Sequence, residues 1–485
     1  MRNLGNSTGT GIRIVGWGLV ASAMAASLSA CGTAQGGTQG TEVEAATSAT
    51  PASEGTAWEP VDTSAATVST PAVSSLDETP ATTAVAAEET AVPAIAQSDD
   101  GGGSDKVTVD GMIADGVVDI GDLFTQRDLK QTADLSGAKA IALASGQDVR
   151  ISEEGTYVLS GSAAETTVYV EAADDAKVQL VLDGVNIENS SRPAICVLSA
   201  DKVFVTTAEG SENSLSVTGT LPDDVDAALF SKDDLTLNGT GTLRISSTAD
   251  GVSCKDDLRV TGGSYEVSAT GHAFDANDSL AVSAGSFLVT AQKDGFHAEV
   301  SDDDTVGLVY VCGGTFDVHA GSDGLQATTF LQIDGGTLSI ETAEGLEATY
   351  VQVNGGSVAI STSDDGINAT TKSASLGTPT IEIRGGDVAI DMAQGDTDAL
   401  DVNGNLIVSG GSVAITGQSA FDFDGTSSFT GGTITVNGSQ VSEIQNSMMG
   451  GGMMGGRGMQ QGGMAGGQGT QPGGPMQGGR GGFSA

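Results

Sequence analysis

The chain has 485 residues, with 63 Asp and Glu against 19 Lys and Arg, so its formal net charge is −44. A surface this acidic repels polyanions, which excludes nucleic acid as a partner of the bulk surface. The 4 cysteines are too few for a disulfide scaffold, and the 71 glycines do not recur at every third position as in collagen. The composition is typical of a secreted, Gly- and Asp-rich protein built from turns and β-branched strands.

Residues 1–31 have the features of an export signal. Arg2 and Arg13 precede an apolar run, residues 14–28, that contains no acid. The run ends in the tetrapeptide LSAC, which resembles a bacterial lipobox, and the resemblance implies that Cys31 is lipidated and becomes the first mature residue. We therefore expect a lipid anchor at the extracellular face of the cell membrane, on the cell surface or in the envelope. The alternative is an ordinary cleaved signal with an accidental cysteine.

Two further segments are predicted to be disordered. Residues 32–105 contain no Lys or Arg and are dominated by Ala, Thr, Ser, Pro, Glu and Gly. Such a segment cannot bury enough apolar surface to offset its chain entropy, so we expect an acidic tether. Residues 446–485 form a Gly/Met-rich tail that holds 7 of the 11 methionines. The folded domain is thus predicted to span residues 106–445.

A unit of 21–22 residues repeats from about residue 230 onward. Its first residues are Asp250, His272, Asp294, Asp323, Glu344, Asp365, Asp398 and Ser419. Their spacing implies two loop insertions, around residues 301–305 and 372–378, and each unit carries a small-residue turn before its second strand. Short alternating strands of this kind cannot close a core alone, but they can when stacked as coils. The sequence therefore predicts an all-β fold, a right-handed parallel β-helix.

Less regular coils of the same solenoid are expected upstream, with strands at residues 140–143, 157–160, 167–171, 178–182 and 202–206. In the regular part, alternation predicts two apolar columns that point inward. The first column is Val252, Phe274, Phe296, Leu325, Leu346, Ile367, Leu400 and Phe421, and the second is Cys254, Ala276, Ala298, Ala327, Ala348, Ala369, Val402 and Phe423. Cys254 is accordingly expected to be a buried, unreactive thiol, as are Cys196 and Cys312 in similarly apolar strands.

Polar residues form two outward columns. One is the column of first residues given above, and the other is Ser253, Asp275, His297, Gln326, Glu347, Asn368, Asp401 and Asp422. Coils stack about 4.8 Å apart, and like charges at that spacing repel by roughly 1 kcal/mol even in water. A ladder of carboxylates therefore favours counterions, and oxygen ligands on adjacent coils suit Ca²⁺.

The predicted calcium ligands fall into two sets. The first set is Glu344, Glu347, Asp364, Asp365 and Asn368, and the second is Asp398, Asp401, Asp422 and Asp424. The alternative interpretation is that Asp-Gly pairs simply make turns and that the outward acids keep a solenoid soluble. The sequence contains neither an EF-hand loop nor a nine-residue Gly-Gly-x-Gly-x-Asp repeat, so no known calcium motif assigns the ligands.

Other chemistry has little support in the sequence. The three histidines are scattered, no pair has the spacing of metal ligands, and no serine lies in a nucleophile elbow. A polysaccharide lyase needs a basic residue beside its acids, and Lys255 is the one candidate on the outward face of the repeats. Its column neighbours, Asn277 and Glu299, favour a simple ion-pair ladder. We assign no catalytic residue.

Several stretches resemble a family of bacterial extracellular carbohydrate-binding parallel β-helix proteins of the clostridial cellulose- and pectin-binding type. They are Ile151–Leu159, Val178–Asn189, Ser199–Asn213 and Ala228–Asn238, together with the repeat motifs EGLEA at 344–348 and DDGINA at 364–369. The resemblance covers about residues 123–440. It implies an extracellular domain that binds Ca²⁺ and plant-type polysaccharides without catalysis, with Glu344, Glu347, Asp364, Asp365 and Asn368 as the matching acids and amide.

Together these observations predict a lipid-anchored, extracellular, non-catalytic protein that binds polysaccharide in a calcium-dependent manner. Both tryptophans, Trp17 and Trp58, lie outside the predicted domain, so the aromatic platforms usual for crystalline cellulose are missing. An acidic glycan such as polygalacturonate is favoured, and cellulose is the second choice; the contacting residues are unassigned. A monomer is expected. The alternatives are a cell-surface adhesin or structural envelope protein and, less favoured, a calcium-dependent polysaccharide lyase or a glycosidase.

Overall fold

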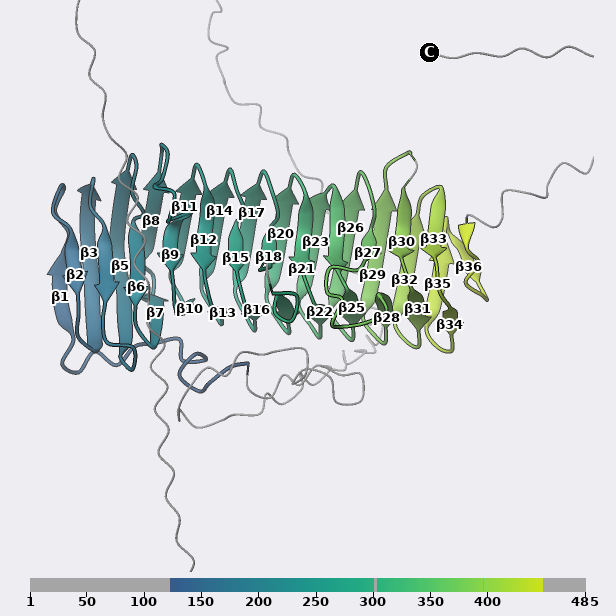
Figure 1. Cartoon of the computed structure of the whole chain (residues 1–485), viewed down its shortest axis with the longest axis horizontal. Coiled ribbons are helices and arrows are strands. Elements are labelled where there is room, and N and C mark those ends of the chain that lie inside the picture. The colour runs from purple at the N-terminus through teal and green to yellow at the C-terminus, as the bar shows by residue number, and fades with distance from the viewer. Residues whose placement is uncertain (1–122, 301–302, 396, 448–485) are drawn as a thin grey trace, which may run out of the picture. The chain divides into compact units, whose positions relative to one another are not determined.

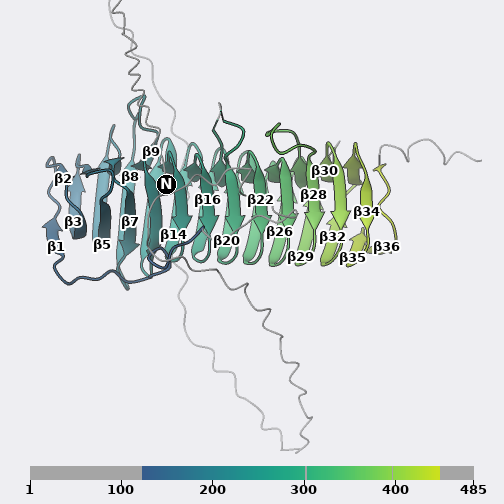
Figure 2. The same cartoon turned by 60° about the horizontal axis from the view of Figure 1, so that its bottom comes forward.

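The computed structural model describes residues 123–300, 303–395 and 397–447, and it is a parallel β-helix (Figure 1). The 36 named elements of these residues are all β-strands. Successive coils follow one another along a single axis in chain order, as the second view also shows (Figure 2). Among the described residues, no helix is long and apolar enough to cross a membrane. The all-β parallel β-helix predicted from the repeat is confirmed.

One face of the solenoid is a 12-stranded parallel sheet, which we call the acidic sheet. Its strands are β2 (Val149–Ile151), β4 (Val168–Glu171), β6 (Ile195–Ser199), β9 (Ala227–Ser231), β12 (Asp250–Cys254), β15 (Phe274–Ala276), β18 (Phe296–Ala298), β21 (Asp323–Ala327), β24 (Glu344–Ala348), β27 (Ile367–Ala369), β30 (Asp398–Val402) and β33 (Ser419–Phe423).

A second face, the middle sheet, follows the acidic sheet in every coil. Its strands are β1 (Lys139–Ala142), the first halves of β3 (Gly155–Ala164) and β5 (Lys177–Asn189), then β7 (Lys202–Thr207), β10 (Asp234–Gly239), β13 (Asp257–Val260), β16 (Ser279–Val282), β19 (Leu308–Val311), β22 (Phe330–Ile333), β25 (Tyr350–Val353), β28 (Thr380–Ile383), β31 (Asn405–Val408) and β34 (Ser427–Phe429).

The third face, the open sheet, completes each coil. It comprises the second halves of β3 and β5, then β8 (Glu212–Val217), β11 (Thr242–Ser247), β14 (Ser264–Ala269), β17 (Ser286–Ala291), β20 (Thr315–Ala320), β23 (Thr337–Thr342), β26 (Ser357–Thr362), β29 (Asp387–Met392), β32 (Ser412–Thr416), β35 (Thr433–Val436) and the antiparallel β36 (Ser439–Val441). Because β3 and β5 run through both faces, the middle and open sheets form one continuous 24-stranded hydrogen-bonded sheet.

The inward columns predicted from the repeat are confirmed. In the acidic sheet Leu325 pairs with Leu346, and Leu346 pairs with Ile367, all of them fully buried. The second column passes from Cys254 through Ala276 and continues in register to later coils. Each coil therefore buries its apolar side chains against the coils on either side, which is how short strands share one core.

The thiols are buried, as predicted. Cys196, Cys254 and Cys312 are free and buried, and burial raises the pKa of each, to about 11 for Cys196 and Cys312. Cys196 lies outside the main core, in a small cluster with Phe230. Thiolate is the reactive form, so these cysteines are unreactive at neutral pH.

The glycine of the repeated acid-Gly pair lies within strands β12, β21 and β24, as Gly251, Gly324 and Gly345, and at a bend directly before β18 and β27, as Gly295 and Gly366. A Cβ added to Gly345 would lie 2.3 Å from the carbonyl oxygen of Gly366 in the next coil. The pair therefore exists because the backbones of adjacent coils approach too closely for a side chain. The turn interpretation is wrong for the pairs inside β12, β21 and β24; tight turns with positive φ occur at positions such as Gly356.

The predicted signal segment 1–31 with Cys31, the tether 32–105 and all but the first two residues of the tail 446–485 lie outside the described residues.

Candidate functional site

The second outward column of the acidic sheet pairs in the register predicted from sequence. Strand pairing aligns Ser253 with Asp275, then His297 and then Gln326. Further along, Glu347 aligns with Asn368, then Asp401 and Asp422. Polar side chains of consecutive coils therefore lie directly above one another along one face of the solenoid.

In the first outward column, several aspartates each use one carboxylate oxygen to accept a hydrogen bond from the next coil. The Oδ1 atoms of Asp250, Asp294 and Asp365 accept the backbone N–H of the equivalent residue in the next coil, at 2.7, 3.0 and 2.9 Å. This fixes each carboxylate and leaves its second oxygen, Oδ2, for other partners. The column thus has a structural role in addition to any part in binding.

Three carboxylates from two coils converge midway along the sheet. Ligand oxygens of Asp323, Glu344 and Glu347 all lie within 4.8 Å of one another. Asp323 is 5% exposed. Loss of solvent, followed by the charges of Asp294, Glu347 and Glu344, raises the pKa of Asp323 to about 8. A cluster that favours a proton this strongly carries uncompensated negative charge.

Two neighbours partly compensate this cluster. Asn368 donates its Nδ2 to Glu344 Oε2 at 3.0 Å, and Lys372 Nζ forms an ion pair with Glu347 Oε2 at 2.8 Å. Lys372 comes from the second loop insertion, between β27 and β28. Sequence reasoning gave neither Asp323 nor Lys372 a place in this cluster, although both were visible: Asp323 opens the preceding unit, and Lys372 is the basic residue of the insertion.

The other predicted ligands lie further along the same face. Burial, then the charges of Asp365, Asp422 and Asp398, raises the pKa of Asp401 to about 7, and burial likewise raises that of Asp365 to about 6. Asp422 accepts a hydrogen bond from Asn446 Nδ2 at 3.1 Å. Asp365 therefore links the two predicted sets, because its carboxylate interacts with Glu344 of the first set and with Asp398 and Asp401 of the second.

Asp364 and Asp424 are the exposed members of the two predicted sets. The charge of Asp364 acts on Glu344 and on Asp365, so it lies between the two acidic groups. Asp398 is held by the hydroxyl of Ser419 in the next coil.

The ion-pair ladder predicted for Lys255 with Glu299 is wrong in its partners. Lys255 Nζ lies 2.7 Å from Asp226 Oδ2 and 3.3 Å from Asp275 Oδ2, so it bridges acids on both neighbouring coils. Glu299 instead accepts Gln326 Nε2 at 3.1 Å. The column register was right, but the lysine side chain turns toward the denser negative charge.

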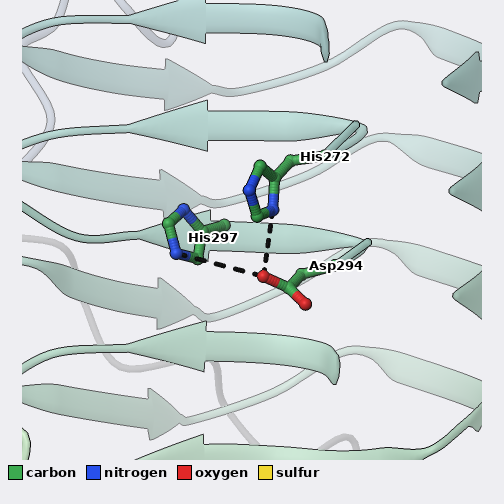
Figure 3. Close-up of side chains that lie close together, drawn as sticks. All are labelled: His272, Asp294 and His297. Carbon is green, nitrogen blue, oxygen red and sulfur yellow. Dashed lines mark ion pairs between the residues drawn. The ribbon is translucent and has the colours of Figure 1, made fainter. Parts of the chain in front are cut away.

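The histidines are also closer than their spacing in the sequence indicated. His272 and His297 stack with ring centroids 4.1 Å apart and an interplanar angle of 17°, beside Asp294 (Figure 3). Their separation of 25 residues exceeds the spacing of any metal motif within a single helix or hairpin. It amounts to one coil plus three residues, and a solenoid brings such positions together.

The acidic groups fit a calcium ion by their chemistry. Asp323, Glu344 and Glu347 offer hard carboxylate oxygens from adjacent coils, and Ca²⁺ takes 6–8 oxygen ligands in flexible geometry. Buried negative charge with an elevated pKa is what a bound divalent cation would relieve. The structure therefore places carboxylate oxygens of adjacent coils close together on this face.

Comparison with known proteins places the chain in a family. Residues 145–399 match the family model described as "Carbohydrate-binding domain-containing protein", and the chain belongs to this family. A protein of Acetivibrio thermocellus with the same description is 33% identical over 125 residues, which is 24% of this chain and 44% of that protein. The match thus covers less than half the length of that relative.

A solved structure described as a polysaccharide lyase-like protein from C. thermocellum, in a gadolinium derivative, is also similar. It is 25% identical, with a TM-score of 0.40, and the match covers 48% of this chain and 96% of that one. A likeness at this level is too distant to support a conclusion about activity.

Proposed function

We propose that this protein is a non-catalytic, extracellular, lipid-anchored polysaccharide-binding protein, and that it binds an acidic glycan such as polygalacturonate through Ca²⁺. Membership of the carbohydrate-binding family supports the ligand class. The observation that carries the calcium dependence is the convergence of Asp323, Glu344 and Glu347 on the acidic sheet.

Charge decides how such a ligand binds. With a formal net charge of −44, the chain repels a polyuronate at long range. A Ca²⁺ ion held by one oxygen each of Asp323, Glu344 and Glu347 keeps coordination positions for ligand carboxylates, because Ca²⁺ takes 6–8 oxygen ligands. The Ca²⁺ ion then bridges the carboxylates of the protein and of the glycan and offsets their repulsion. Binding without calcium is not expected.

The spacing of the site suits a repeating ligand. Coils present equivalent positions about 4.8 Å apart, and a polysaccharide presents its carboxylates at regular intervals along a chain. Weak contacts repeated along the acidic sheet add up through multivalency, so affinity should rise with glycan length.

Isothermal titration of the full chain with polygalacturonate tests the proposal. We expect heat of binding in Ca²⁺, none in excess chelator, and no absorbance from unsaturated products. Polygalacturonate retained in chelator contradicts calcium bridging. Rising absorbance reassigns the protein as a lyase and makes Lys255 the first residue to replace. No heat in either buffer favours the adhesin interpretation, which a cell-adhesion assay then examines.

Lipid anchoring is tested separately by replacing the cysteine of the lipobox. Cys31→Ser removes the thiol that would carry the acyl chains. We expect the variant to leave the membrane fraction and appear in the medium. Continued membrane association of Cys31→Ser contradicts the anchor and leaves the glycan-binding proposal untouched.

A further inference from the structure

We propose that His272, Asp294 and His297 form a binding site for Zn²⁺, distinct from the calcium ligands of the acidic sheet (Figure 3). The inference is independent of the proposed function, because it rests on nitrogen ligands that Ca²⁺ does not favour. Imidazole together with a carboxylate is a donor set that suits zinc.

The three ligand atoms lie within 4.8 Å of one another. Asp294 Oδ2 is 2.9 Å from His272 Nδ1 and 3.9 Å from His297 Nε2. Around a zinc ion with bonds of about 2.0–2.1 Å, two tetrahedral ligand atoms lie roughly 3.4 Å apart. The observed distances bracket that value, and the His272 ring must turn out of its stack with His297 so that both imidazoles can reach one ion.

The surroundings already orient the ligands. His297 Nδ1 lies 2.7 Å from Asp275 Oδ1. Because a carboxylate only accepts, Nδ1 carries the proton and Nε2 presents its lone pair to the site. Asp294 is fixed likewise, since its Oδ1 accepts the backbone N–H of Asp323 at 3.0 Å. A carboxylate behind a histidine is the usual second layer of a zinc site.

His272 supplies the observation that points to a ligand. Its Nδ1 is buried against Asp294 Oδ2, 2.9 Å away, and makes no hydrogen bond of good geometry. A buried imidazole nitrogen without a hydrogen bond is costly unless something else uses it. Zn²⁺ would displace the Nδ1 proton to solvent and bind Nδ1 and the Asp294 carboxylate together.

The site is shielded but not closed. The side chains of His272 and His297 are each 13% exposed and that of Asp294 is 4% exposed. On the open side, Glu299 Oε2 lies 4.0 Å from His297 Nε2 and can approach as a fourth ligand. The exposed Lys293, 3.4 Å from His272 Nε2, must turn away when the ion binds, because Nε2 then carries the proton.

The test uses the full chain in Ca²⁺ at a concentration that saturates the oxygen sites. We expect one equivalent of Zn²⁺ to bind under these conditions, and Co²⁺ to give the intense visible absorption of a tetrahedral site. His272→Gln and His297→Gln should each abolish this equivalent. Asp275→Asn, which alters only the second layer, should weaken binding by about 10- to 100-fold.

His319 provides the matched control. It also contacts two acids, Asp317 Oδ1 at 3.4 Å and Glu341 Oε2 at 3.3 Å, but its side chain is 48% exposed and no second histidine is near. His319→Gln should bind Zn²⁺ as the wild type does. Thermal unfolding of each metal-free variant checks that the fold is intact; His272 precedes β15, so its replacement is the mildest for the fold.

Three results would overturn the proposal. The first is the absence of a Zn²⁺ equivalent in saturating Ca²⁺. The second is unchanged Zn²⁺ binding in a folded His272→Gln variant. The third is an equal loss in His319→Gln, which would indicate adventitious binding by surface acids and imidazoles.

Discussion

The acidic sheet and the open sheet come from the same repeat, yet they treat their outward side chains differently. On the open sheet the outward residues of β23 and β26, such as Ser339 and Ala359, are exposed. On the acidic sheet the residues of the two outward columns are buried or half-buried, and the most buried acids include Asp294 at 3% and Asp323 at 5% exposure. The repeat fixes which way a residue points, but local packing decides whether its charge is solvated. Binding chemistry is therefore expected where charge is withdrawn from water.

The largest effect should come from removing calcium ligands on the acidic sheet. We expect Glu344→Gln combined with Glu347→Gln to abolish the rise in Tm that Ca²⁺ gives the wild type, because two of three converging carboxylates are lost. Glu341→Gln is the control. It removes one of the two charges that the double variant removes, three residues before Glu344 on the open sheet, where the Glu341 side chain is 72% exposed. Equal loss in the control would mean that calcium responds only to net charge.

A second contrast uses two cations in matching positions. Lys255 bridges Asp226 and Asp275 on the acidic sheet, and Arg244 bridges Glu212 and Glu266 on the open sheet. Lys255→Met leaves Asp275, whose side chain is 10% exposed, with less compensation, and should cost about 1–3 kcal/mol of unfolding free energy.

Arg244→Met should leave the unfolding free energy unchanged within error, because all three side chains are solvated. Urea unfolding at matched ionic strength measures both variants. An equal loss of unfolding free energy in the two variants would show that burial does not make ion pairs on the acidic sheet stronger than those on the open sheet. Added salt should leave the Lys255→Met difference largely intact, since buried pairs are weakly screened.

Much of this architecture could be predicted from the sequence because the repeat is regular. The columns containing Leu346 and Ala348 were assigned from spacing alone and pair in that register. Strand alternation determines direction, so inward and outward residues follow once the period is known. The upstream coils were located less completely, because β3 and β5 are long strands that turn a corner without a glycine pair to mark it.

The side-chain partners of the site could not be predicted in the same way. Lys255 has flexible rotamers and turns to Asp226, in the preceding coil, instead of Glu299. His272 and His297 come together because one occupies the first column and the other the second, one coil further on. Aligning the repeats predicts contacts between residues at equivalent positions of neighbouring coils. It does not predict side-chain contacts between the first and the second outward column, which require the three-dimensional structure.

A third expectation concerns the close approach of coils under the acidic sheet. Gly345→Ala places a Cβ 2.3 Å from the carbonyl oxygen of Gly366, so adjacent coils must separate. We expect a loss of about 1–3 kcal/mol of unfolding free energy, the usual cost of overpacking. Ala359→Ser, on the exposed surface of β26, is the control and should change little. If Gly345→Ala is neutral, the acid-Gly pair is not required for coil stacking.

The smallest expected effect is a pH dependence of stability that comes from Asp256. This residue lies at the corner between β12 of the acidic sheet and β13 of the middle sheet. Burial, then the charges of Asp234, Asp257 and Asp278, raises the pKa of Asp256 from 3.8 to about 7. The native state therefore holds a proton that the unfolded chain has already released above pH 4. Native stability then falls as pH rises through 7. Asp256 is only half-buried, so we expect a contribution of about 1 kcal/mol after solvent screening.

Asp256→Asn separates this contribution from the rest of the acidic sheet. The amide stays neutral at every pH, so the variant should exceed the wild-type Tm slightly at pH 5 and by more at pH 8, with a flatter profile between. Thermal unfolding in chelator measures this without interference from bound cations. A wild-type Tm that rises between pH 5 and pH 8 would reverse the sign. It would mean that the native state stabilises the charged form of Asp256 despite its burial among other carboxylates. The difference in solvation between the acidic sheet and the open sheet would then not include Asp256.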